Sequence, residues 1–148
     1  MPPRRAGRPG PRTMWDFPAD PGVARLARDL YERGAVLAAV CHGPSALVGA
    51  TLSDGTPLVA GRRVAAFTDS EEHAAGAADA VPFLLQTRLE QLGAIHTGAP
   101  DWQPHVVVDG NLITGQNPAS ATGVAEAVVA TASRRAGAAP SAPSGGRR

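Results

Sequence analysis

Residues 35–47 read AVLAAVCHGPSAL, and this stretch decides the fold class. Six small or apolar residues, 35–40, run directly into Cys41, the only cysteine of the 148-residue chain. A short, unbroken apolar run of this kind predicts a strand that is buried on both faces of a parallel sheet. One cysteine excludes an intramolecular disulfide, which favours a reducing, cytoplasmic compartment.

The residues after this strand predict a nucleophile elbow, the tight turn that lifts a reactive side chain out of a sheet. Ala39 lies two residues before Cys41 and Gly43 two residues after it, and a strained turn needs such small neighbours. A helix that begins near Gly43 and reaches about Ala50 would point its amino terminus at the sulfur and favour the thiolate. The alternative is an inert, buried cysteine that packs like a small hydrophobic residue.

His42 is the candidate base beside the thiol, and its backbone amide would face a developing oxyanion. Adjacent side chains point apart on regular structure, so only the sharp turn brings the imidazole to the sulfur. A base also needs an orienting acceptor, and the segment FTDSEE leaves Asp69, Glu71 and Glu72 open for this role. These acids follow a second predicted strand, residues 64–67, whose carboxyl end would lie beside the elbow. The alternative for acids at a helix start is stabilisation of the helix dipole.

The rest of the chain predicts alternating helices and strands, which is typical of an α/β fold. Asp20 and Pro21 form a helix start, and the apolar face of that helix includes Leu26 before it ends at Gly34. Asp109-Gly110 between two β-rich runs predicts a hairpin near 105–115. We also expect strands at 57–59 and 94–97, helices at 70–80 and 82–93, and a last helix from Asn117 that carries Val124, Val128 and Val129.

The charge is divided between the middle of the chain and its ends, although the net charge is +1. All 13 acids lie between Asp16 and Glu126, whereas eight of the 14 arginines lie outside that span. An acidic body is a poor surface for nucleic acid, so we expect no specific nucleic-acid partner. Residues 1–13 and 136–148, rich in proline, glycine and arginine, are expected to be disordered tails around a domain at 14–135. No apolar run approaches the ~20 residues of a membrane helix, so we expect no membrane partner.

We expect no metal and no cofactor. The spacings of His73, His96 and His105 relative to His42 match no standard zinc pattern, and one cysteine is too few for a structural zinc site. Residues 115–118, GQNP, contain a glycine but no phosphate-loop pattern, which argues against nucleotide binding.

Five separated blocks resemble the DJ-1/PfpI superfamily, whose members are class I glutamine amidotransferase-like, and they occur in one order. The blocks are MWDFPADP, AVCHGPSAL, FTDSEE, VPFLLQTRLEQLGA and VVVDGNLITGQNPASA. The resemblance covers residues 14 to about 133 and is greatest to the branch of glutathione-independent glyoxalases and chaperones. It implies a flavodoxin-like three-layer α/β sandwich with a mostly parallel sheet.

The resemblance also implies roles for individual residues. By motif match, Cys41 is the nucleophile, His42 its partner and Glu72 the acid that orients His42. Gly43 lies at the pocket, and Trp15 and Trp102 are candidate pocket walls, with simple packing as the alternative for both tryptophans.

The function that the resemblance implies is a cysteine-dependent, cofactor-free conversion of small 2-oxoaldehydes, such as methylglyoxal, into 2-hydroxy acids, such as D-lactate. This is the chemistry of glyoxalase III, with a small aldehyde as the partner and a homodimer left open. One alternative is a truncated, catalytically impaired relative that acts as a chaperone-like or non-enzymatic fragment. Another is a cysteine amidase or peptidase of the same superfamily, which the elbow fits equally well.

The chain departs from the family before the block MWDFP. Family members have several βα units there, whereas 13 residues precede the block in this sequence. We therefore expect a sandwich without its amino-terminal βα units, with one sheet edge unpaired and apolar helix faces exposed. The family's Pro-Gly-Gly-His-Gly type stretch, whose amides help to form the oxyanion hole, is replaced by RPGPR at 8–12, and prolines cannot donate. The resemblance therefore also implies impaired catalysis.

Overall fold

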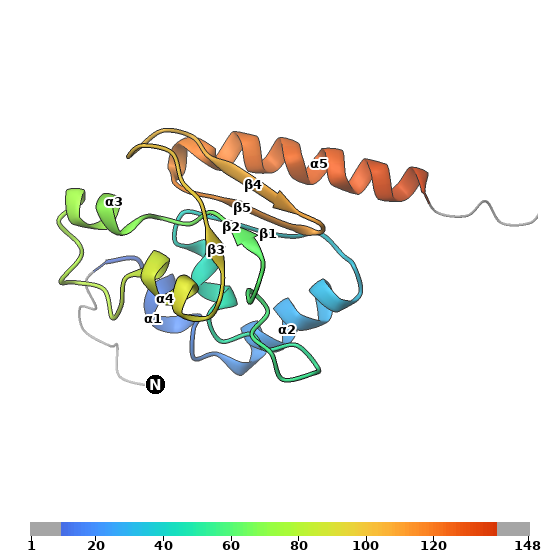
Figure 1. The fold of residues 1–148 in the computed structure, drawn as a ribbon, viewed down its shortest axis with the longest axis horizontal. Coiled ribbons are helices and arrows are strands. Elements are labelled where there is room, and N and C mark those ends of the chain that lie inside the picture. The colour runs from blue at the N-terminus through green and yellow to red at the C-terminus, as the bar shows by residue number, and fades with distance from the viewer. Residues whose placement is uncertain (1–9, 139–148) are drawn as a thin grey trace, which may run out of the picture.

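The computed structural model describes residues 10–138, so most of both predicted tails lies outside the described residues. Figure 1 shows the elements in chain order. They are α1 (Thr13–Asp16), α2 (Pro21–Glu32), β1 (Leu37–Val40), the 3-10 helix η1 (Gly43–Leu47), β2 (Arg63–Val64), α3 (Asp69–Ala74), α4 (Leu85–Gln91), β3 (Ile95–His96), β4 (Val106–Asp109), β5 (Leu112–Gly115), the 3-10 helix η2 (Pro118–Ser120) and α5 (Ala121–Gly137). Helical structure therefore begins one residue before the predicted domain and ends two residues after it.

The strands form two small sheets rather than the single, mostly parallel sheet that the resemblance implies. β1, β5 and β4 form a mixed sheet in that order, with β1 parallel and β4 antiparallel to β5. β2 and β3 pair in parallel as a separate two-stranded sheet. The two sheets are linked by a hydrogen bond to a side chain: the amide of Ala65, just after β2, donates to the Thr114 hydroxyl of β5 at 2.8 Å.

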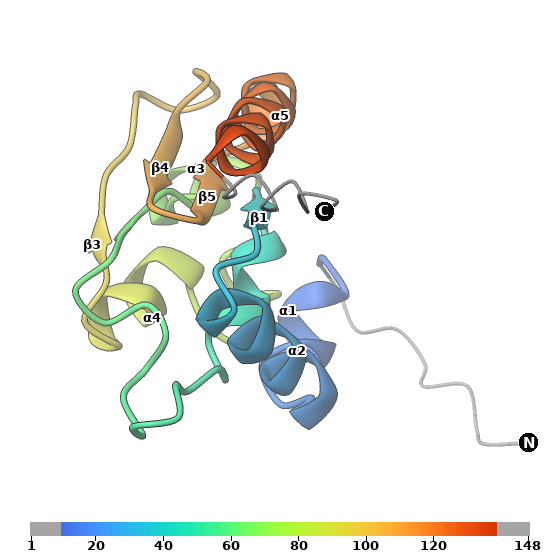
Figure 2. The same cartoon turned by 90° about the vertical axis from the view of Figure 1, so that its right-hand side faces the viewer.

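Helices pack on both sides of β1, and the combination of helices with small mixed sheets confirms an α/β fold. α5 packs on β1 and β5, while α2 and η1 contact β1. Figure 2 shows α5 and α2 on opposite sides of β1. The main apolar core includes Met14, Leu47, Leu58, Val59, Val64, Leu85, Leu89 and Leu112.

β1 lies at an edge of its sheet, and its burial differs from the prediction. The amides of Leu37 and Cys41 donate to the carbonyls of Asn111 and Gly115, at 2.8 and 2.9 Å. Alternate residues of a strand face one partner, so the backbone of Ala38 faces the other side. Within residues 10–138 no strand pairs with that side; Ala38 is exposed and the rest of β1 is half-buried. A strand buried on both faces is therefore wrong here, whereas the unpaired sheet edge is confirmed.

The first long helix forms where the sequence predicts it. The Asp20 carboxylate accepts two amides of the first turn, and Gly34, with φ +73°, follows the helix end. Its apolar face is incompletely covered, because Ala27 is buried but Leu26 is 60% exposed. The expected exposure of apolar helix surface is thus present on α2.

Two of the predicted helices are shorter in the structure. α3 ends at Ala74, because Gly76 adopts a left-handed φ of +69° that stops the helix. α4 begins at Leu85, three residues after Pro82. α4 buries Leu85 and Leu89 completely.

Two turn segments also differ from the prediction. Instead of the strand predicted at 57–59, Pro57 forms an isolated antiparallel bridge with Thr51, and a turn follows in which Leu58 and Val59 are fully buried. The hairpin of β4 and β5 is confirmed, but Asp109 pairs with Leu112, so the two-residue loop is Gly110-Asn111. The positive φ of +60° at Gly110 meets the requirement of such a tight hairpin.

Candidate active site

Cys41 lies on the predicted tight turn at the carboxyl end of β1. Its φ of +61° is in the left-handed region, which costs a non-glycine residue about 1–2 kcal/mol. Two hydrogen bonds of 2.9 Å hold this backbone: the amide donates to Gly115, and the carbonyl accepts from the amide of Phe67. A Cβ added to Gly43 would lie 3.4 Å from the Cβ of Ala39, so these two small residues adjoin each other at the turn.

The side chains of Cys41, His42 and Glu72 form one line of polar contacts. The Sγ of Cys41 lies 3.4 Å from Nδ1 of His42, and Nε2 of His42 lies 2.7 Å from Oε2 of Glu72. If the Nε2–H donates to the carboxylate, Nδ1 is the acceptor that faces the thiol. The side chains of His42 and Glu72 are 13% and 2% exposed. Of the three acids that the sequence leaves open, Glu72 is therefore the one that contacts the imidazole.

The other acids of the FTDSEE segment have structural contacts. Thr68 and Glu71 form a capping box, in which the Thr68 hydroxyl accepts the Glu71 amide and the Glu71 carboxylate accepts the Thr68 amide. Asp69 accepts a hydrogen bond from the hydroxyl of Thr87 on α4. Among the residues described, one buried oxygen of this segment has no hydrogen-bond partner, and it is Oε1 of Glu72.

Glu71 is a buried carboxylate next to the polar line, and its partners were not predicted. Gln116 and Asn117, both fully buried after β5, donate to it, and so does the amide of Trp102. Burial by itself raises the pKa of Glu71, but the bonds from Asn117, Gln116, Trp102 and Thr68 outweigh it and hold the pKa below its ordinary value. The signal in the sequence is two amide side chains directly after a buried strand, where polar residues need partners.

Two aromatic rings, those of Phe67 and Trp102, lead from the imidazole toward the surface. The Phe67 ring centroid lies 4.3 Å from that of His42, and the Trp102 ring packs edge-on against Phe67 at 5.7 Å. Trp102 also has a left-handed φ of +66° and is 47% exposed. The structure therefore places Trp102 beside the site with Phe67 between it and His42, and the sequence analysis missed Phe67.

The second candidate wall, Trp15, lies on α1. This helix packs against η1, the segment that directly follows the elbow, and the hydroxyl of Ser45 donates to the Thr13 carbonyl at 3.1 Å. Trp15 is half-buried there. The structure thus places α1, which carries Trp15, next to the segment that follows the elbow. The role of Trp15 as a pocket wall stays a prediction.

The electrostatics around the sulfur oppose its ionisation. Burial raises the pKa of the Cys41 thiol above its ordinary value, the backbone amide of His42 lowers it in part, and the charges of Glu71 and Glu72 raise it again. The expected helix after the elbow is a 3-10 helix of five residues, too short to offset these effects. These effects favour the neutral thiol, whereas the sequence predicts a thiolate stabilised by a helix terminus.

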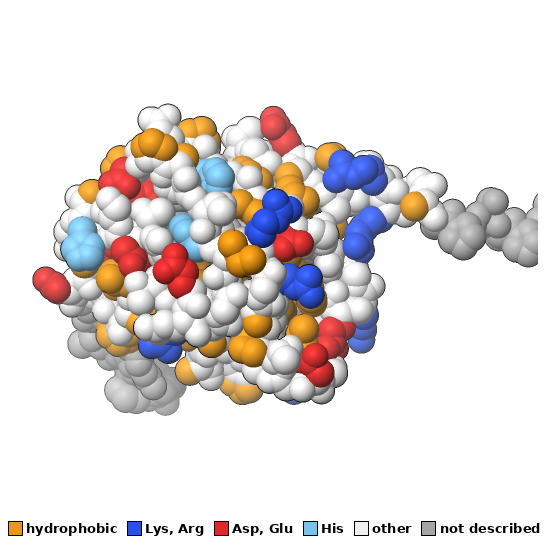
Figure 3. Space-filling view, viewed as in Figure 1, with side chains coloured by type: hydrophobic (Ala, Val, Ile, Leu, Met, Phe, Trp, Pro, Cys, Tyr) orange, Lys and Arg blue, Asp and Glu red, His pale blue; other side chains and the backbone are white. Residues whose placement is uncertain are grey.

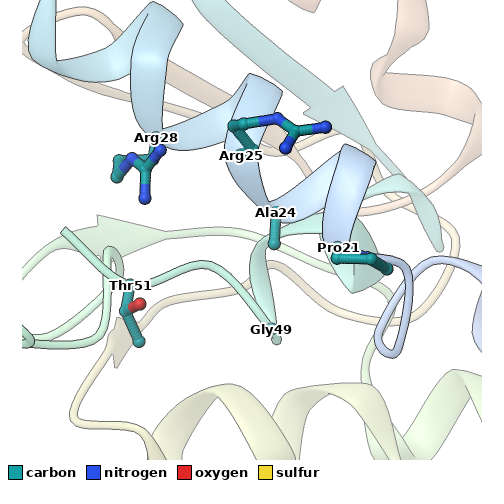
Figure 4. Close-up of a pocket in the computed structure, with 6 residues that line it drawn as sticks. All are labelled: Pro21, Ala24, Arg25, Arg28, Gly49 and Thr51. Carbon is teal, nitrogen blue, oxygen red and sulfur yellow. The ribbon is translucent and has the colours of Figure 1, made fainter.

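One surface hollow lies away from this line of contacts. It is lined by Pro21, Ala24, Arg25, Arg28, Gly49 and Thr51, between α2 and the segment after η1 (Figure 4). None of Cys41, His42 and Glu72 lines it. Apolar side chains are scattered over the face drawn in Figure 3, among polar and charged ones.

The part of the chain that the structure describes contains neither a group of metal-ligating side chains nor a membrane-spanning helix. In residues 10–138 no three side chains of histidine, cysteine, aspartate or glutamate are grouped so that they could hold a metal ion. In the same range no helix has the length and apolar character needed to cross a membrane.

Known proteins resemble the chain in sequence and in structure. The model of the DJ-1/PfpI family matches residues 7–131. Glyoxalase 3 of Candida albicans is 35% identical over 133 residues, which cover 84% of this chain and 55% of that protein. The glutathione-independent glyoxalase HSP31 of Saccharomyces cerevisiae is 34% identical over 118 residues, which cover 76% and 50%.

Two crystal structures show the same likeness in three dimensions. Glyoxalase III of Candida albicans superposes with a TM-score of 0.74 at 31% identity, covering 80% of this chain and 52% of that one. The Rapid Encystment Protein 24 KDa of Francisella tularensis superposes with a TM-score of 0.78 at 37% identity, covering 80% and 53%. The chain spans about half the length of the curated relatives it matches.

Proposed function

Because the chain belongs to the DJ-1/PfpI family, we propose that it uses Cys41 to convert small 2-oxoaldehydes, such as methylglyoxal, into 2-hydroxy acids without glutathione. The observation that carries this proposal is the line of contacts from Cys41 through His42 to Glu72. The substrate class comes from the relatives, which are named as glutathione-independent glyoxalases. This chain spans only about half the length of these relatives, so we also propose that this half carries their activity.

The first step is the addition of Sγ to the aldehyde carbon. Nδ1 of His42 accepts the thiol proton as the carbon–sulfur bond forms, and the imidazolium then gives this proton to the carbonyl oxygen, which produces a hemithioacetal and restores the neutral imidazole. Glu72 stabilises the imidazolium through its bond to Nε2, which keeps the ring oriented toward the sulfur. The raised pKa of the Cys41 thiol makes this proton transfer necessary at neutral pH.

The second step moves a proton between the two carbons of the substrate. His42 takes the proton from the carbon bonded to sulfur, and the resulting enediol is reprotonated on the neighbouring carbon, which leaves a thioester of the 2-hydroxy acid. Water then hydrolyses the thioester, releasing the acid and restoring the thiol. One water is consumed, and no oxidant is needed because the aldehyde carbon is oxidised as the ketone carbon is reduced.

The test is the formation of D-lactate from methylglyoxal by the purified chain without glutathione. We expect turnover that is lost in Cys41→Ala and His42→Ala and kept in His73→Ala, whose imidazole lies on the exposed side of α3. A folded wild-type chain that forms no D-lactate contradicts the proposal. Hydrolysis of glutamine or of a peptide by the same protein, without aldehyde turnover, would favour the amidase or peptidase.

A second candidate function is that of a chaperone-like fragment, and the open edge of β1 favours it. An edge strand presents backbone groups that pair with extended chains, and the exposed Leu26 of α2 adds apolar surface. Suppression of the aggregation of a heat-unfolded test protein would show this activity. It is expected to persist in Cys41→Ala, which separates it from the enzyme.

A further inference from the structure

Glu71 has more hydrogen-bonding partners than a helix cap requires. Its carboxylate is fully buried and accepts from four residues on three segments of the chain. The donors to Oε1 are Thr68 N (3.2 Å), Thr68 Oγ1 (3.0 Å) and Gln116 Nε2 (2.9 Å); the donors to Oε2 are Trp102 N (3.0 Å) and Asn117 Nδ2 (2.9 Å). Both carboxylate oxygens therefore accept hydrogen bonds, and every donor is an N–H or O–H group.

Two of these partners, and Glu71 itself, connect to members of the polar line. Gln116 directly follows Gly115, whose carbonyl accepts the amide of Cys41. The Trp102 ring packs against Phe67, and Phe67 packs against the His42 ring. Glu71 itself precedes Glu72 on α3. One carboxylate thus connects to the nucleophile, the base and the orienting acid by separate paths.

The backbone at Trp102 adds a reason for this arrangement. A left-handed φ of +66° is unfavourable for a tryptophan and persists only where the surroundings hold it. The bond from the Trp102 amide to Oε2 of Glu71 is one such contact. Loss of that acceptor would release the residue whose ring supports Phe67.

We propose that Glu71 is a positioning residue, whose carboxylate holds the Cys41 elbow, the Phe67–Trp102 rings and the start of α3 in one arrangement. This role serves the chemistry proposed above, but its test needs no turnover. A failure of the aldehyde assay and a failure of this proposal are therefore separate results.

The substitution Glu71→Gln separates this role from simple capping. A capping box accepts glutamate or glutamine, so a residue that only caps α3 tolerates the change. A glutamine places an NH2 group where one carboxylate oxygen accepted bonds, and this group then faces donors. Thr68→Val is the matched variant for the cap, because it removes the hydroxyl at the helix start and leaves the donors on Gln116, Asn117 and Trp102 in place.

The readout is amide hydrogen exchange measured residue by residue by NMR. In Glu71→Gln the amides of Trp102 and Cys41 are expected to exchange at least about tenfold faster, as befits the loss of bonds to a charged group. In Thr68→Val these two amides are expected to stay within about twofold of wild type while those of α3 speed up. The amide of Ile113, in the centre of the sheet, reports global unfolding in every variant.

Faster exchange confined to α3 in Glu71→Gln overturns the proposal, because it is the pattern of a cap alone. Glu90→Gln is the control for the loss of a negative charge, since Glu90 is exposed on α4, and it is expected to change neither amide. If Glu71→Gln does not fold, Asn117→Ala removes one donor to Oε2 and is expected to speed the Trp102 amide at least about threefold. No change at that amide overturns the proposal equally.

Discussion

The two ends of the Cys41–His42–Glu72 line are built differently. At the acid end, Glu71 and Glu72 are buried on α3, and Glu71 is bonded to three segments of the chain. At the cysteine end, β1 is a half-buried edge strand whose outer side no strand within residues 10–138 covers. The difference teaches that α3, which carries Glu72, is anchored to the rest of the fold through Glu71, while β1, which carries Cys41 at its end, pairs with a strand on one side only.

The largest effect is expected for Glu72→Gln, which tests whether the carboxylate of Glu72 takes part in the proposed reaction. Removal of the charge that stabilises the imidazolium is expected to lower kcat/KM for methylglyoxal by about 10²–10⁴-fold. Thermal stability should be kept or raised, because a buried carboxylate with one oxygen lacking a partner is replaced by a neutral group. Turnover that stays within about twofold of wild type would remove Glu72 from the mechanism.

Unlike Glu72→Gln, the variant Glu71→Gln is expected to lose stability, by about 3 kcal/mol near pH 6. The pKa of Glu71 lies below its ordinary value, so its stabilisation is complete above an unfolded pKa of about 4.3. It is lost as the pH falls through the lower pKa of the folded state. Denaturant unfolding of both proteins between pH 6 and pH 3 measures this, and the difference between them should shrink with acid. A difference that is constant across this range contradicts the account.

Gly115→Ala tests the residue that connects the two ends of the line. Its carbonyl accepts the amide of Cys41, and Gln116, which follows it, donates to Glu71. A Cβ there would lie 2.6 Å from Cγ2 of Val124 and 3.1 Å from Cγ2 of Val40, so α5 or β1 has to shift. We expect a loss of about 2 kcal/mol from overpacking, measured by urea unfolding. Gly55→Ala is not a suitable control, because its φ is +87°, whereas Gly137→Ala meets no atom within 4 Å and should change little. An unchanged free energy of unfolding in Gly115→Ala would show that the surroundings of Gly115 are loosely packed.

The smallest effect is expected at the open edge. Ala38→Lys should cost less than about 0.5 kcal/mol, because the side chain is exposed on an edge strand. Ala39→Lys, one residue along, should cost at least about 1 kcal/mol more, because Ala39 packs beside Gly43 at the turn. Equal losses of thermal stability in the two variants would show that the outer side of β1 is covered.

The elbow could be predicted because its cause is local. Small residues on both sides of Cys41 predict the tight turn, and the structure has a strained, positive φ there. The capped start of α2 and the hairpin of β4 and β5 are local in the same way. The hairpin loop lies one residue later than expected because Asp109 joins the ladder.

The contacts that could not be predicted join residues far apart in the chain. Glu71 and Gln116 are 45 residues apart, and neither residue's neighbours show that the two meet. The burial of β1 was overestimated because a run of small residues does not say how many strands flank it. The pKa of Cys41 is hard to predict for a related reason, since the burial that mainly raises it, and the charges of Glu71 and Glu72 that add to this, depend on other elements of the fold.

The most direct test of this account is the pH dependence of Cys41 alkylation by iodoacetamide. Cys41 is the only cysteine, so the rate reports one thiol. We predict a midpoint above the value of about 8.5 for a free thiol, and a lower midpoint in Glu72→Gln, because burial and two carboxylates raise the pKa of Cys41. A midpoint below about 7, as found for thiolates stabilised by their surroundings, would contradict the claim that the site holds a neutral thiol for His42 to deprotonate.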